Sequence, residues 1–74
     1  MQQQYLNALS KLSAGAKRFN DEHIPVMLDR LLELSMQPAQ QLRYWQEIRG
    51  YMFTVVDMMT IQDIDDHLEN KAAS

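Results

Sequence analysis

The sequence contains no cysteine, and only two glycines and two prolines in 74 residues. Without cysteine the chain has neither a disulfide framework nor a thiolate zinc site, two devices that stabilise many very small domains. Two glycines are too few for a glycine-rich phosphate-binding loop. A chain of this length buries only about 60% of its unfolded surface. We therefore expect one domain, residues 1–74, whose thin core is stabilised by packing or by a partner.

Long apolar runs and clustered positive charge are also missing. No segment approaches the roughly 18 uninterrupted apolar residues of a membrane span, and the N-terminus lacks the pattern of a signal peptide. The formal net charge is −3, and the seven Lys and Arg residues are dispersed along the chain. A protein that binds nucleic acid directly needs a basic stripe that follows the phosphates. We expect a soluble cytoplasmic protein that contacts neither membrane nor nucleic acid directly.

Apolar residues recur at helical spacing, and no segment alternates like a strand. The first helix is predicted over residues 3–20 from a stripe with spacings of three and four: Tyr5, Leu9, Leu12, Ala16 and Phe19. A second predicted helix, 25–35, carries apolar side chains on its core face and also around its side, the latter being Val26, Leu32 and Met36. Both predicted helices end in short connections, which favours antiparallel neighbours.

Prolines and capping residues set the remaining boundaries. Pro25 and Pro38 suit the first turn of a helix and predict that helices begin there. Thr60 followed by Asp63 resembles a capping pair, so the third helix is predicted over 38–59 and a short fourth over 61–70, with the last residues frayed. The predicted fold is all-α, an antiparallel bundle of three helices with a short fourth.

The predicted third helix has more apolar surface than one neighbour covers. Its apolar arc spans roughly 220°, where a surface helix needs little more than about 100°. Trp45 lies near the middle of this arc and is expected in the core. Tyr44, Tyr51 and Met58 lie one heptad apart at its edge, and Arg49 interrupts it. We predict these four as a protein interface, because Tyr and Arg are enriched in binding hot spots, and we expect the chain to self-associate or to need a partner.

No catalytic or metal-binding constellation is recognisable. Asp63 and His67 share one helix face, but a metal site needs a third or fourth ligand, so the acidic run is interpreted as a solvated face. No serine has a histidine at a suggestive spacing, and the acids lie on polar faces where burial would not raise a pKa. The sequence therefore predicts a non-enzymatic protein without cofactor, metal or small-molecule substrate.

Several short motifs resemble small helical binding proteins. The segment from Gln40 to Asp57, with Trp45, the Arg49-Gly50 pair and an apolar run that ends in an acid, resembles the C-terminal helix of small proteins encoded beside phage head and connector genes. This resemblance covers about a quarter of the chain. It implies a non-enzymatic component of a virion, in which case the virion would be its location.

Two other resemblances imply other contexts. The Pro25-Val26 pair, and Pro38 followed by Leu42-Arg43-Tyr44-Trp45, resemble the theta subunit of bacterial DNA polymerase III and its phage homologue, which implies an accessory subunit of a replication polymerase. The Trp45-Gln46 pair resembles the second helix of co-chaperones of type III secretion needles. All three families bind another protein. The sequence thus predicts a protein-interaction or structural subunit, with a protein partner or as a homo-oligomer.

Overall fold

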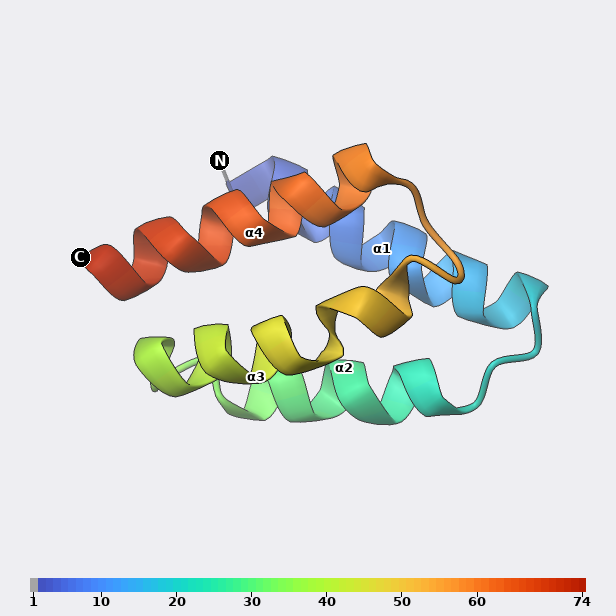
Figure 1. Ribbon diagram of the computed structural model, residues 1–74, viewed down its shortest axis with the longest axis horizontal. Coiled ribbons are helices and arrows are strands. Elements are labelled where there is room, and N and C mark those ends of the chain that lie inside the picture. Colours follow the sequence, from blue (N-terminus) through green and yellow to red (C-terminus); the bar gives the residue numbers. More distant parts are fainter. Residues whose placement is uncertain (1) are drawn as a thin grey trace.

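The computed structural model describes residues 2–74, which form four α-helices and no strand. The helices are α1 (Gln2–Arg18), α2 (His23–Glu33), α3 (Pro38–Met52) and α4 (Met58–Ala73). Each helix runs antiparallel to the one before it, and α1 and α3 each pack against both α2 and α4 (Figure 1). The predicted all-α antiparallel bundle is confirmed.

The turn between α1 and α2 is built from two side chains that suit it. Asn20 adopts a left-handed backbone conformation (φ 54°), and the N–H of Asp21 bonds the carbonyl of Ala16 at 2.8 Å, a Schellman-type ending. The carboxylate of Asp21 then accepts the backbone N–H groups of His23 and Ile24. Because the N–H groups of His23 and Ile24 have this hydrogen-bond partner, α2 begins at His23. The predicted start at Pro25 is therefore two residues too late.

The third helix is shorter than predicted, because it ends at Met52 and not at residue 59. Residues 53–57 form a turn in which the N–H groups of Val55 and Val56 both bond the carbonyl of Met52. Thr54, Val55 and Val56 are β-branched, which lowers their helix propensity. The apolar arc predicted for one helix is thus divided between α3 and α4.

The fourth helix is longer than predicted and starts at a different cap. Asp57 is the N-cap in an extended conformation, and its carboxylate accepts both the backbone N–H and the hydroxyl of Thr60. The predicted Thr60–Asp63 cap is therefore wrong. At the other end, Lys71 donates to the carbonyl of Ser35 and, at 3.1 Å, to the side-chain oxygen of Gln41. This anchor keeps the residues that were expected to fray in the helix.

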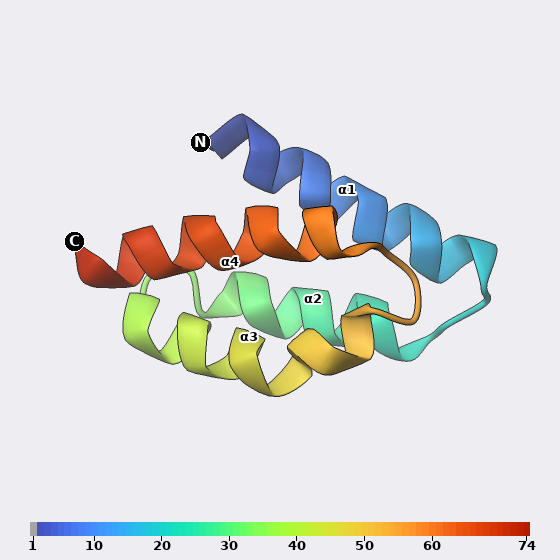
Figure 2. The same ribbon diagram turned by 45° about the horizontal axis from the view of Figure 1, so that its top comes forward.

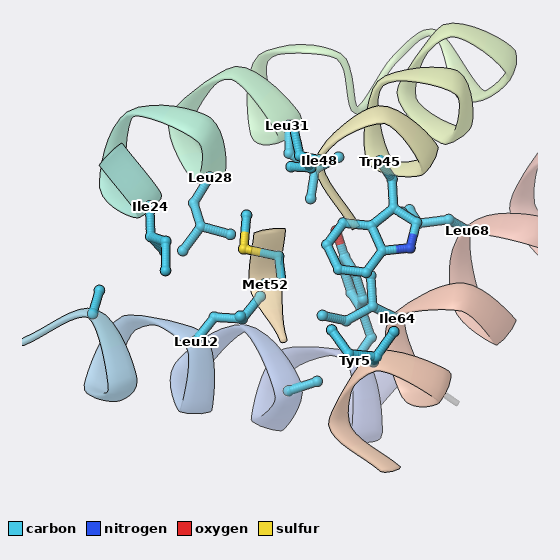
Figure 3. Close-up of a cluster of buried hydrophobic side chains, with 13 residues drawn as sticks. Tyr5, Leu12, Ile24, Leu28, Leu31, Trp45, Ile48, Met52, Ile64 and Leu68 are labelled. Atoms are coloured by element: carbon cyan, nitrogen blue, oxygen red, sulfur yellow. The ribbon is translucent and has the colours of Figure 1, made fainter. Parts of the chain in front are cut away.

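The core collects side chains from all four helices (Figure 3). Trp45 is fully buried, as predicted, and Met52 lies between Leu12 of α1 and Leu28 of α2 in the close-up. Phe19, predicted in the core stripe of the first helix, is exposed. The chain turns away immediately after it, so no later helix covers this position.

The helices within residues 2–74 are all too short or too polar to cross a membrane.

Candidate protein-interaction surface

The four residues predicted as an interface do not form one surface. Arg49 extends from α3 towards α4, where its Nε lies 3.0 Å from both carboxylate oxygens of Asp65. Tyr51 extends the other way, and its hydroxyl donates to Asp21 at 2.6 Å. Tyr44 is half-buried against the core, and Met58 belongs to the first turn of α4. The structure therefore separates this set over two flanks of α3 and a second helix.

Asp65 is the centre of a polar network inside the bundle. Its Oδ1 accepts the indole N–H of the buried Trp45 at 2.7 Å, in addition to Arg49. The guanidinium of Arg49 also lies 5.5 Å from the ring centroid of Phe53, and the pairing with Asp65 raises its pKa. The interpretation of the acidic run as a solvated face fails at Asp65. This network supports the α3–α4 packing and leaves Arg49 paired within the chain.

Tyr51 and Met58 remain accessible, with exposed fractions of 39% and 51%. The carboxylate of Asp21 accepts the Tyr51 hydroxyl and two backbone N–H groups, and together these bonds lower the pKa of Asp21. The same hydroxyl bond raises the pKa of Tyr51. Tyr51 thus ties the end of α3 to the α1–α2 turn, and its role as a partner contact stays a prediction.

Asp63 and His67 are not assembled into a metal site. The ring of His67 stacks on Tyr5, with centroids 3.9 Å apart and an interplanar angle of 6°. Among residues 2–74, no group of three or more His, Asp and Glu side chains is placed to hold a metal ion. His67 instead fixes the N-terminal part of α1 on α4.

One hollow, of about 250 Å³, lies between α1 and the start of α4. It combines the cations Lys11 and Arg18 with the carboxylate of Asp57, which is already committed to capping α4. The carboxylate would repel an anion drawn by the two cations. Because the hollow is open and carries charges of both signs, its electrostatics select neither an anion nor a cation.

A second hollow, the α1–α2 groove, is mainly apolar and has a volume of about 180 Å³. It arises because α1 packs more extensively on α4 than on α2, and the two helices diverge from their shared turn in both views (Figures 1 and 2). Its lining comes from two helices: Leu9 and Ser13 of α1, and Pro25, Leu28, Asp29 and Leu32 of α2.

Two exposed leucines, one on each helix, lie along the groove. Leu32 is part of its lining, and Leu6 precedes Leu9 by one turn on the same face of α1. Met36 lies in the turn after α2, which ends at Glu33. Their exposed fractions are 46% for Leu6, 50% for Leu32 and 88% for Met36. Isolated exposed leucines are ordinary, whereas exposed leucines on both sides of an apolar groove are typical of a binding surface.

The charges beside the groove have opposite signs on its two sides. Helix α1 carries three basic residues and no acid, and Lys17 lies one turn from Ser13 on the groove side. On the α2 side, Asp29 lines the groove, and Glu22 precedes it by two turns. Residues 2–74 contain two ion pairs, Arg30–Glu33 and Arg49–Asp65. Lys17, Glu22 and Asp29 therefore have no ion-pair partner among the residues that the structure describes.

Sequence reasoning placed the binding surface on the third helix and missed this groove. The signal was the apolar side row of the second predicted helix. Its Leu32 lies in α2 next to the core-facing Leu28 and Leu31, and its Met36 lies after the end of α2. A row of this kind is apolar whether a neighbouring helix covers it or not. Its exposure follows only from the divergence of α1 and α2.

Comparisons with models of known protein families, with curated proteins and with solved structures give no match for this chain.

Proposed function

We propose that this protein is a non-enzymatic binding or structural subunit that acts by contact with another protein chain through the α1–α2 groove. The observation that carries the proposal is the pair of exposed leucines, Leu6 and Leu32, on the two sides of a groove that Leu9 and Leu28 also line. Burying a fully exposed leucine contributes about 1.5–3 kcal/mol, so a few half-exposed leucines supply useful affinity.

The carboxylates of Asp21 and Asp57 accept hydrogen bonds that cap α2 and α4. The carboxylate of Asp65 accepts hydrogen bonds from Trp45 and Arg49. All three therefore have structural partners within the fold.

The biological setting is proposed from the motif resemblances alone. A component of a phage head or connector is the first proposal, and a polymerase accessory subunit or a secretion co-chaperone are the alternatives. All three settings require a surface that binds protein, and in this proposal the α1–α2 groove is that surface. The genes that neighbour this one separate the three settings at once.

The test is the hydrodynamic size of the tagged full-length chain in an extract of the cells that encode it. We expect the chain to elute in an assembly larger than its own 8.7 kDa. Replacing Leu6 and Leu32 together with Lys should release it to the size of the free chain. The matched control replaces Val26 and Met59, which are exposed away from the groove, and should leave the assembly intact. Elution of the unaltered chain at monomer size would contradict the proposal.

A further inference from the structure

We propose that the occupant of the α1–α2 groove is a second copy of this chain, related by a twofold axis parallel to the groove. This proposal rests on the proposed function, because it names the partner of the same surface. In this arrangement α1 of one copy lies antiparallel on α2 of the other. The α1–α2 pairs of the two copies then face each other and enclose the two grooves between them.

Apolar complementarity follows from the levels of the residues along the groove. Leu9 and Leu32 both line the groove, and they lie at the same level on opposite sides because they are equally far along the chain from the α1–α2 turn. A twofold axis along the groove places Leu9 of one copy opposite Leu32 of the second copy. The twofold axis repeats this contact, so the dimer contains two Leu9–Leu32 contacts.

Charge complementarity favours this orientation over the other symmetric one. The axis along the groove places the basic edge of α1, with Lys17, beside the acidic edge of α2 in the second copy. Glu22 is the acid nearest in level to Lys17, because the two residues are almost equally far along the chain from the α1–α2 turn. An axis across the groove would instead place α2 on α2, with Asp29 close to its own copy. Like charges at close range are unfavourable. Lys17 therefore gains an ion-pair partner in Glu22 of the second copy in one arrangement only.

The size of the face suits a stable dimer. The molecule measures 35 × 20 × 18 Å, and the groove runs along its long axis between two helices. A standard interface buries about 800 Å² on each partner, which is comparable with one long face of this chain. The proposal is an isologous contact, in which the same patch serves both copies.

The experiment is sedimentation equilibrium of the purified full-length chain over a concentration series in the micromolar range. We expect a monomer–dimer equilibrium for the unaltered chain. Leu32→Lys should raise the dimer dissociation constant by more than about a hundredfold, because it places two charges at the centre of the apolar contact. A chain that stays monomeric throughout the series overturns the dimer. If the same chain still forms a larger assembly in the cell extract, the proposed function stands without it.

Charge exchange tests the arrangement with variants at exposed positions, where folding is not at risk. Lys17→Glu alone and Glu22→Lys alone should each weaken the dimer about tenfold, since each turns two symmetric attractions into repulsions. A one-to-one mixture of these two variants should dimerise about as well as the unaltered chain. In the mixed dimer the two substituted positions carry opposite charges and face each other, and the native pair forms once. Failure of the mixture to recover dimerisation overturns the arrangement.

A second surface variant distinguishes the groove from the surface predicted on α3. Tyr51→Lys combined with Met58→Lys leaves the groove unchanged and should leave the dissociation constant within about twofold, as for substitutions outside an interface. Circular dichroism should show that every variant retains its helical content. If this double variant dissociates the dimer and Leu32→Lys does not, the interface lies at Tyr51 and Met58 and the groove proposal is wrong.

Discussion

Gly15 lies directly against Val55, where the α3–α4 connection crosses α1. A Cβ atom placed on Gly15 would lie 2.7 Å from the carbonyl oxygen of Val55 and 2.8 Å from its Cβ. Cβ atoms essentially never come this close to non-bonded atoms, so the crossing requires a glycine. Glycine inside a helix costs about 1 kcal/mol relative to alanine. In return, the absence of a side chain at Gly15 lets the α3–α4 connection lie directly on α1. This contact positions the start of α4.

Gly15→Ala should therefore lower the free energy of unfolding by about 1–3 kcal/mol, the range for overpacking a well-packed contact. Gly50→Ala is the matched control, since its Cβ would meet nothing within 4 Å, and it should stabilise the protein by about 0.5–1 kcal/mol. Urea unfolding followed by the single tryptophan measures both. Equal stabilisation by the two alanines would show that the α1 crossing is not tight.

The indole N–H of Trp45 depends on Asp65 as its acceptor, and this bond should be measurable as stability. Asp65→Ala leaves a buried donor without a partner, which costs about 1–3 kcal/mol. Asp66→Ala changes the neighbouring exposed acid and should stay within about 0.5 kcal/mol of the unaltered protein. Urea unfolding of both variants provides the comparison, together with the emission maximum of Trp45. A native-like Asp65→Ala variant would mean that water replaces the carboxylate.

The His67–Tyr5 stack should make stability fall in mild acid. Burial, and then the positive charge of Lys71, lower the pKa of His67. The neutral ring is favoured in the folded state, so its contribution is complete above the unfolded-state pKa of about 6.5. That contribution is lost as the pH falls from there through the lower folded-state pKa.

Thermal melts between pH 8 and pH 5 should show this loss of stability for the unaltered protein. His67→Gln should flatten the pH dependence in that window, whereas His23→Gln, which leaves the stack intact, should preserve it. An unchanged slope in the His67→Gln variant would assign the pH dependence to other groups.

Tyr51 and Met58 should tolerate charge. Both side chains are exposed, so replacing them together with Lys should preserve a cooperative thermal transition, because a surface row accepts charge and a buried row does not. The matched comparison is Met52→Lys at a fully buried position, which should unfold the domain. Circular dichroism separates these outcomes, and unfolding of the double variant would place the two residues in the core.

The sequence by itself determined the class of fold and most of the core. Apolar residues at spacings of three and four mark the inner faces of all four helices. Pro38 marks the start of α3 correctly, because its fixed φ suits a first helical turn. Trp45 was placed in the core from its position in the apolar arc alone. These features are local, since they depend on the helical period and on backbone preferences of single residues.

Only the tertiary structure decided where α3 ends and which apolar rows stay uncovered. The apolar pattern continues from α3 through residues 53–57 and masks two local signals for a break, the β-branched residues 54–56 and the cap at Asp57. The packing of Val55 against Gly15 decides that the helix ends there. Asp65 looks like any solvated acid until α4 lies beside Trp45 and Arg49. The α1–α2 groove has the same origin, because an apolar position such as Leu32 is exposed or buried according to how closely a neighbouring helix approaches it.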